Sequence, residues 1–276
     1  MNNTKHTWKK TVTALIALIC MFAITMLTLA ACGSSGGSGE DEDPGEKKVL
    51  IVGTEPTYAP FDTVDDDGNV IGFDMDLIQA IADDQGFEIE FMTLEFDALI
   101  PALESGQIDI IAAAMNGNNP ERQKKVDFSD PYYETGLVVV VDIENDKIGS
   151  IEDFDTETVA CSQIGSVGAD IITEMEADGK IKKAVVNNGF DVCLLQVMNG
   201  DVDATIMSKP TAENAIKKYP GELKIVGDKL DEGWAGFAVQ KGNTELLDKI
   251  NVGLAHMKEN GTYDDLLTKW FADYEE

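Results

Sequence analysis

The sequence contains a single arginine, Arg122, and the residues before it indicate a chemical role. An apolar run at 110–114 is typical of a buried strand. A polar loop at 115–119 follows, and Asn119 with Pro120 forms a helix-start signal. Arg122 is therefore expected in a first helical turn beyond the carboxyl end of a strand, where ligands bind in α/β sheets. A guanidinium there suits a carboxylate or phosphate, and an ordinary surface arginine is the alternative.

Composition excludes several classes of function. The chain has 51 acidic and 21 basic residues, which gives a formal net charge of −30. Such an acidic balance argues against nucleic acid as a partner and against a basic membrane-surface patch. Beyond the leader described below, the only histidine is His256. This excludes multi-histidine metal sites, and it excludes Ser-His-Asp or Cys-His catalysis in any cleft that His256 does not face. We expect no cofactor and no metal.

Two cysteines, Cys161 and Cys193, lie in apolar segments of the folded part. Buried cysteines of this kind are predicted to be unpaired thiols. A disulfide between them is the alternative, because an exported protein meets oxidising conditions. Sequence spacing cannot supply the geometry that a disulfide needs, so the thiols are favoured.

The amino-terminal part indicates export. Three lysines precede an apolar run at 12–31, which predicts a signal peptide over residues 1–31. Small residues before Cys32 resemble a bacterial lipoprotein box, which implies cleavage before Cys32 and a lipid on its sulfur. A plain transmembrane anchor is the alternative. Residues 32–48 are Gly/Ser-rich and then acidic, so we expect a flexible linker between membrane and folded domain.

From residue 49 onward, strand-like and helix-like segments alternate. Buried apolar runs predict strands, and segments with a 3.6-residue period predict helices. This alternation is typical of parallel sheets with right-handed crossovers, and it starts again near residue 158. We therefore predict an α/β fold of two doubly wound lobes. Lobe 1 is expected to span residues 49–140 and 236–276, and lobe 2 residues 141–235.

A hinge and a ligand cleft are expected between these lobes. Two strand-like passages, near 136–142 and 232–239, could cross from one lobe to the other. Two crossings make a hinge, and a ligand cleft follows from it. Gly165 opens a turn that would offer N–H groups to this cleft, although a plain strand–helix turn is equally compatible. Asp74 is expected to cap a helix, and residues 67–69 to form a hairpin turn.

Six segments occur in an order and spacing that carry a resemblance. They are residues 52–61 (VGTEPTYAPF), 70–76 (VIGFDMD), 96–103 (FDALIPAL), 120–122 (PER), 126–133 (VDFSDPYY) and 261–264 (GTYD). Across nearly all of residues 48–272 the chain resembles the extracytoplasmic solute-binding proteins of amino-acid ABC transporters, bacterial solute-binding protein family 3. The resemblance implies a type II periplasmic-binding-protein-like fold whose lobes close on a small solute.

The resemblance also implies roles for individual residues. Arg122 would pair with the α-carboxylate of the ligand, and Ala114 would contribute its backbone carbonyl. Ser166 falls on the turn where the second lobe helps to bind that carboxylate. Tyr58 and Phe96 would sandwich the ligand from the first lobe, with core packing as the alternative for both.

Three further positions concern the ligand's ammonium group and side chain. Glu55 falls where similar proteins place an acidic residue that recognises the side chain of the ligand. Asn116 is placed on a hydroxyl position that accepts from the ligand ammonium, in a loop that is one residue longer than the family pattern. The family's ammonium-binding aspartate falls on Ser208, which carries no charge and could instead cap a helix before Pro210. Either the ammonium is neutralised elsewhere, for example by Glu55, or the ligand is not an ordinary α-amino acid.

Three functions are compatible with this resemblance. The favoured one is a lipid-anchored, monomeric receptor outside the cytoplasm that hands a carboxylate-bearing solute, most often a polar amino acid, to an ABC permease. A cyclohexadienyl-dehydratase-like enzyme would need a general acid, for which Glu55 is the candidate, but nothing in the sequence indicates a raised pKa. A sensory module would usually carry a following transmembrane helix and signalling domain, which we do not expect after Glu276. No enzymatic activity is therefore predicted.

Overall fold

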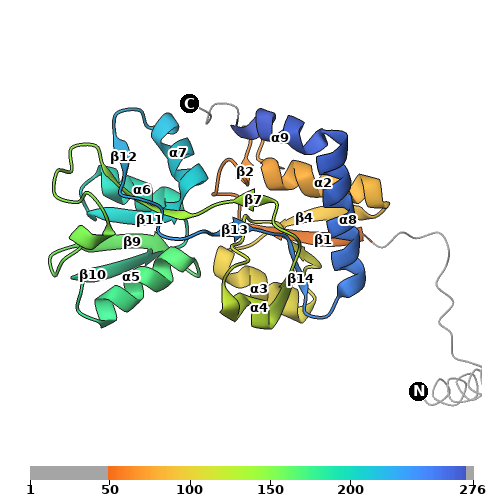
Figure 1. The fold of residues 1–276 in the computed structure, drawn as a ribbon, viewed down its shortest axis with the longest axis horizontal. Coiled ribbons are helices and arrows are strands. Elements are labelled where there is room, and N and C mark those ends of the chain that lie inside the picture. The colour runs from red at the N-terminus through yellow and green to blue at the C-terminus, as the bar shows by residue number, and fades with distance from the viewer. Residues whose placement is uncertain (1–48, 272–276) are drawn as a thin grey trace, which may run out of the picture. The chain divides into compact units, whose positions relative to one another are not determined.

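The computed structural model describes residues 49–271, which form two lobes (Figure 1). Each lobe is built around one five-stranded mixed sheet, with strand order β4-β1-β5-β14-β6 in lobe 1 and β10-β9-β11-β8-β12 in lobe 2. The predictions for the signal peptide, the lipid on Cys32 and the linker at 32–48 lie outside the described residues.

Lobe 1 contains the first part of the folded chain and its carboxyl-terminal helices. Its elements are β1 (Val49–Thr54), β2 (Thr63–Val64), β3 (Val70–Ile71), α2 (Phe73–Gln85), β4 (Glu88–Thr93), α3 (Phe96–Ser105), β5 (Ile110–Ile111), α4 (Pro120–Lys125), β6 (Val126–Phe128), β14 (Ala238–Gln240), α8 (Thr244–Asn260) and α9 (Thr262–Phe271). β1 pairs in parallel with β4 and β5, and β14 pairs antiparallel with β5 and β6.

Lobe 2 is formed by the middle of the chain. Its elements are β8 (Leu137–Asp142), the 3-10 helix η1 (Ile151–Asp153), β9 (Val159–Gln163), α5 (Val167–Ala177), β10 (Lys183–Asn187), α6 (Phe190–Met198), β11 (Ala204–Ser208), α7 (Lys209–Lys218) and β12 (Leu223–Val226). β9 pairs in parallel with β10 and β11, whereas β8 runs antiparallel to β11 and β12.

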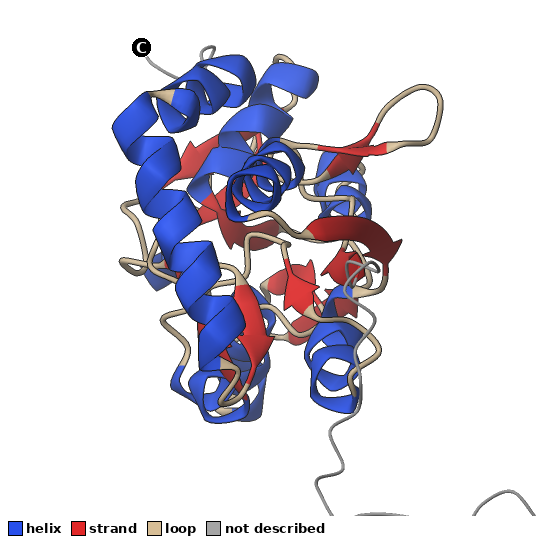
Figure 2. Cartoon of the chain, turned by 90° about the vertical axis from the view of Figure 1, so that its right-hand side faces the viewer, coloured by secondary structure: helices blue, strands red, loops and turns tan. Residues whose placement is uncertain are grey.

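Helices cover both faces of each sheet, because successive side chains of a strand point to opposite faces. In β1, Val52 belongs to the core under α2 and α8, whereas Ile51 packs against the core under α3. Figure 2 looks onto lobe 1 and shows helices in front of the strands. Lobe 2 likewise has one core on the α6 and α7 side and another on the α5 side.

Two short strands connect the lobes. β7 (Tyr133–Glu134) pairs antiparallel with β13 (Trp234–Ala235), and both cross between the lobes in Figure 1. The loop after β5 contacts this hinge, and its Gly117 N–H donates to the Trp234 carbonyl at 3.0 Å. A Cβ atom on residue 117 would lie 2.1 Å from the Trp234 ring, so this close approach requires glycine.

The structure corrects the predicted boundary between the lobes. β8 pairs with β11 and β12, so residues 137–140 belong to lobe 2, and the crossing lies earlier, at β7. A strongly β-branched strand fits the interior of either sheet, and its own sequence does not select the partner. The passage at 136–142 is therefore not itself the crossing segment.

Two further predictions differ from the structure. Cys161 and Cys193, predicted as free thiols, form a disulfide between β9 and α6, with Cα atoms 5.9 Å apart. The buried strand expected at 110–114 is regular only at β5, and Ala114 at its far end has a φ of +42°. The hairpin turn at 67–69 is confirmed between β2 and β3.

Within residues 49–271, no helix is both long and apolar enough to cross a bilayer.

Candidate ligand-binding site

Arg122 lies where the sequence predicts it, in the first turn of α4. The Asn119 side chain caps this helix by accepting from the backbone N–H groups of Glu121 at 2.9 Å and Arg122 at 3.3 Å, and Pro120 occupies the first turn. The side chain is not an ordinary surface arginine, because only 7 % of Arg122 is exposed.

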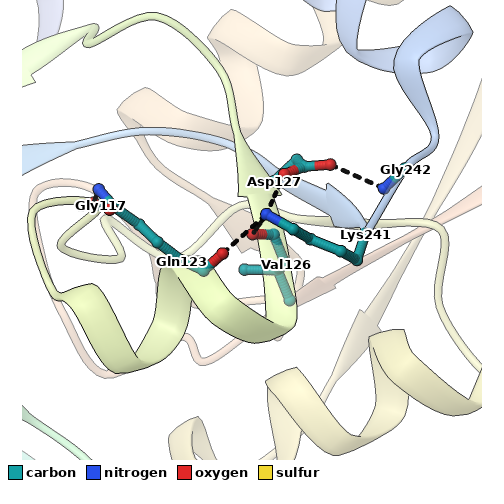
Figure 3. Close-up of polar contacts among 6 residues, drawn as sticks. All are labelled: Gly117, Gln123, Val126, Asp127, Lys241 and Gly242. Carbon is teal, nitrogen blue, oxygen red and sulfur yellow. Dashed lines mark hydrogen bonds and ion pairs between the residues drawn. The ribbon is translucent and has the colours of Figure 1, made fainter.

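The carboxyl-terminal end of α4 is fixed by Lys241, which follows β14 (Figure 3). The Lys241 ammonium donates to the carbonyl of Gln123 at 2.7 Å and pairs with the Asp127 carboxylate at 2.5 Å. The Gly242 N–H donates to the second oxygen of Asp127, and the Gln123 amide donates back to the Gly117 carbonyl. A cation beside the last helical carbonyls stabilises a helix end, so helix α4, which carries Arg122, is stabilised at its carboxyl-terminal end as well as at its N-cap.

The guanidinium of Arg122 spans the two lobes. One nitrogen, Nη1, donates to the Asn116 carbonyl at 3.0 Å, and Nη2 donates to the Gly165 carbonyl of lobe 2 at 2.8 Å. Its Cζ atom lies 5.4 Å from the centre of the Phe96 ring. Burial lowers the pKa of Arg122 to about 10, so the group remains a cation at neutral pH. A guanidinium has five N–H donors, so these two bonds leave donors for a ligand.

A cavity of about 40 Å³ adjoins Arg122 between the lobes. It brings together every site residue predicted from the sequence except Glu55. Its lining residues are Tyr58, Phe96, Ala113, Ala114, Asn116, Arg122, Thr135, Leu137, Gln163, Ser166, Val167, Gly168, Phe190 and Ser208. The binding roles of the predicted residues remain predictions, but their placement allows all of them to touch one ligand.

Aromatic side chains line the cavity from both lobes. The Tyr58 ring lies 5.3 Å from the Phe190 ring, centre to centre, and Phe96 lies below the Arg122 guanidinium. The Tyr58 hydroxyl accepts the Ser208 N–H at 3.3 Å, across the cleft, and burial raises the pKa of Tyr58. Phe190 was not anticipated, because an aromatic residue at the start of an apolar helix is usually read as core.

Glu55 does not line the cavity. One of its carboxylate oxygens accepts from the Thr57 hydroxyl at 2.6 Å, and the other accepts from the Gln163 amide at 2.9 Å. Burial raises the pKa of Glu55, while these two hydrogen bonds act in the opposite direction. Gln163 of β9, in contrast, lines the cavity. The signal that could have identified Gln163 is its place at the end of a predicted strand, directly before the Gly165 turn.

Ala114 is held in place by Asp74. The Asp74 carboxylate accepts from the Ala114 N–H at 2.7 Å and from the Tyr132 hydroxyl at 2.6 Å. Asp74 was expected to cap α2, but Gly72 is the N-cap and Asp74 points into the core. Glycine is required at residue 72, because φ is +147° and a Cβ atom there would lie 2.0 Å from the Phe61 carbonyl oxygen.

Two serines begin helices of lobe 2 beside the cavity. Ser166 caps α5, its hydroxyl accepting from the Ala169 N–H at 3.1 Å. Ser208 ends β11 and takes the N-cap position of α7, but its hydroxyl makes no capping bond and pairs with Thr211 at 3.1 Å. Ser208 is therefore available to the cavity as a neutral oxygen. Within residues 49–271, no group of three or more acidic, histidine or cysteine side chains is arranged to hold a metal ion.

Comparisons with known proteins agree with this architecture. The family model described as "Bacterial extracellular solute-binding proteins, family 3" matches residues 50–273. The chain is 36 % identical to the arginine-binding extracellular protein ArtP of Bacillus subtilis, over 95 % of this chain and 98 % of that protein. It is 34 % identical to a probable amino-acid ABC transporter-binding protein of Haemophilus influenzae, over 85 % of this chain and 89 % of the relative.

The solved structures show the same two-lobed fold. An ancestral arginine-binding protein, bound to arginine, superposes with a TM-score of 0.76 and 41 % sequence identity. The match covers 81 % of this chain and 98 % of that chain. The predicted α/β fold of two lobes, of the type II periplasmic-binding-protein kind, is confirmed.

Proposed function

The chain belongs to family 3 of the bacterial extracellular solute-binding proteins, and from this premise we propose that it binds an amino acid between its lobes and delivers it to an ABC permease. The observation that carries the proposal is Arg122. Its buried cationic guanidinium faces the cavity between the lobes and keeps donors that the described residues do not use. A buried planar cation of this kind suits one carboxylate of a small solute.

The remaining lining groups suit the rest of an amino acid. Neutral oxygens that could accept from an ammonium belong to Ser208 and to the backbone of Ala114, and Asn116 lies beside them. Tyr58 and Phe96 would cover the apolar part of the ligand. The relatives named above bind arginine or other amino acids, which supports a polar amino acid over other carboxylates.

Binding would work by lobe closure. Hydrogen bonds already link the lobes at the cavity, from Arg122 to the Gly165 carbonyl, from Gln163 to Glu55, and from the Ser208 N–H to Tyr58. A ligand that touches residues of both lobes adds contacts that exist only in the closed form. It therefore shifts the population toward that form, which the permease would then recognise.

The location follows from the same proposal. The matched family is extracellular. We infer that Cys32 carries the lipid that anchors the protein to the cell membrane, with residues 32–48 as the tether and the protein acting as a monomer.

The position of Glu55 supports the binding function over the enzymatic alternative. A general acid must come within hydrogen-bond reach of its substrate. Glu55 does not line the cavity, and its two carboxylate oxygens accept from the Gln163 amide and the Thr57 hydroxyl. Its raised pKa therefore does not place an acid beside a bound solute.

A thermal-shift screen against the standard amino acids, followed by calorimetry, tests the proposal. Ligand at about 100 times its Kd should add roughly 2.7 kcal/mol to the folded state, which is a rise of about 5–10 °C in Tm. Arg122→Ala should abolish this shift, because the carboxylate loses its only cationic partner in the cavity lining. Lys124→Ala is the matched control, since Lys124 lies on the same helix and is exposed.

Arg122→Lys distinguishes a binding defect from a folding defect. Lysine keeps the charge but loses the planar fork, so a folded variant with an affinity at least about tenfold weaker is expected. Affinity within a factor of about three of the wild type for Arg122→Ala would contradict the proposed role.

A further inference from the structure

Gln163 presents a defined face of its amide to the cavity. Its Nε2 donates to the Glu55 carboxylate of lobe 1 at 2.9 Å and to the Asn188 carbonyl at 2.9 Å. A backbone carbonyl only accepts, so the group facing Asn188 must be the nitrogen. Because Gln163 is 2 % exposed, the amide has little freedom to turn over.

The consequence concerns the amide oxygen of Gln163. Both N–H groups are already used, and no described residue donates to Oε1, although Gln163 lines the cavity. The one free polar atom of this side chain is therefore an acceptor. The Glu55 carboxylate behind it adds negative charge, and Glu95 and Asp191 add to the negative potential at Glu55.

We propose that Gln163 determines ligand specificity and that Glu55 is its positioning residue, so that the end of the ligand remote from Arg122 must carry a hydrogen-bond donor. Amide, imidazole, guanidinium and ammonium side chains satisfy this condition. A side-chain carboxylate does not, because its oxygens would face an acceptor oxygen backed by a carboxylate. The inference rests on the proposed function, since it takes the ligand carboxylate to lie on Arg122.

Calorimetry on the full chain tests the proposal with amino acids of known side-chain chemistry. Glutamine and glutamate form one pair of equal shape, and asparagine and aspartate form another; arginine, histidine and leucine complete the panel. We expect the tightest ligand to be a donor-bearing amino acid, and both acidic amino acids to bind at least about 100-fold more weakly. An acidic amino acid within tenfold of the tightest ligand, or leucine as the tightest, would overturn the inference.

A variant of Gln163 assigns this preference to one atom. Gln163→Leu keeps the approximate volume but removes the acceptor, so the preference for the tightest donor-bearing ligand over glutamate should fall to less than about fivefold. Gln196→Leu is the same change in the same lobe; it removes an acceptor of the Asn187 amide outside the cavity lining, and it should leave the preference unchanged. An unchanged preference in Gln163→Leu would overturn the assignment.

The positioning role of Glu55 is measured by the preference, which is the ratio of the affinity for the tightest donor-bearing ligand to the affinity for glutamate. Glu55→Leu removes one of two restraints on the Gln163 amide, so the preference should fall by about tenfold. Glu55→Gln should restore the preference, because its amide oxygen can accept the same bond. A preference that Glu55→Leu leaves intact would overturn this role.

Different results would contradict the proposed function and the role of Gln163. If the wild type binds no amino acid at all, the proposed function fails and this inference fails with it. If amino acids bind but acidic ones bind as well as the others, only the inference about Gln163 fails.

Discussion

Ser208 offers the cavity an uncharged oxygen at the end of β11, where the resemblance to the family expects a carboxylate. Its hydroxyl is paired with Thr211, and its N–H is paired with Tyr58, so the local structure is complete without a charge. At 3 % exposure, a charge placed here would be poorly screened by solvent. If the ligand ammonium lies here as proposed, the affinity should be sensitive to a charge at this position.

Ser208→Asp is expected to strengthen the binding of α-amino acids. A charged hydrogen bond is stronger than a neutral one by about 1 kcal/mol, which corresponds to roughly a fivefold lower Kd. Isothermal titration calorimetry measures the change, and Ser208→Asn serves as the uncharged control of similar size. If Ser208→Asp brings no gain, the ligand ammonium does not lie at this position.

At the scale of elements, helix α2 is tied to the segment that follows β5 through a buried carboxylate. Asp74, in the first turn of α2, accepts the N–H of Ala114 and so stabilises the left-handed conformation of that residue beside the cavity. Its second oxygen, Oδ1, has no partner among the described residues, and the buried Asp62 nearby also has a raised pKa. Two carboxyl groups in a dry core make lobe 1 sensitive to pH.

The stability of lobe 1 should therefore fall as the pH rises. Burial raises the pKa of Asp74 from 3.8 to about 7, so the folded state binds this proton more tightly than the unfolded chain does. The resulting stabilisation is complete below pH 3.8 and is lost as the pH rises through about 7. Asp74→Asn removes this dependence, so its stability relative to the wild type should increase by roughly 2 kcal/mol between about pH 5 and about pH 8.

Urea unfolding at several pH values measures this difference. Asp83→Asn is the control, because it removes an exposed carboxylate from the same helix. A constant difference between Asp74→Asn and the wild type across this range would show that Asp74 does not titrate there.

At the scale of the whole molecule, the proposed binding depends on two lobes that are joined by a small set of polar contacts. The Ser208 N–H of lobe 2 reaches the Tyr58 hydroxyl of lobe 1, and the Asn214 amide reaches the Ala59 carbonyl at 3.4 Å. Both contacts join residues of different lobes, so we expect them to stabilise the closed form proposed to bind the ligand.

Tyr58→Phe should weaken ligand binding by about tenfold. The variant keeps the ring but leaves the Ser208 N–H without its acceptor in the closed form, at a cost of about 1–3 kcal/mol. Calorimetry gives the affinity, and small-angle X-ray scattering shows whether the bound form still closes. Tyr219→Phe, in lobe 2 and outside the cavity lining, is the matched control, and equal affinities for both variants and the wild type would exclude the proposed contribution of the hydroxyl.

Local sequence signals determined much of this protein by themselves. The Asn119-Pro120 helix start, the hairpin turn at 67–69 and the alternation of strands and helices depend on neighbouring residues, and the structure bears them out. Because Arg122 follows such a signal directly, its place in the first helical turn could be predicted locally, whereas its role at a ligand site was implied by the family resemblance.

Only the tertiary structure decided which distant segments meet. The β-branched strand β8 could have joined either sheet, and the Cys161–Cys193 disulfide required β9 and α6 to pack together. Gln163 lines the cavity, whereas Glu55 does not and instead accepts a hydrogen bond from Gln163 across the lobes. These outcomes depend on contacts between residues that are far apart in the chain. The energies of such contacts are set by burial in the folded core, so no local sequence pattern predicts them.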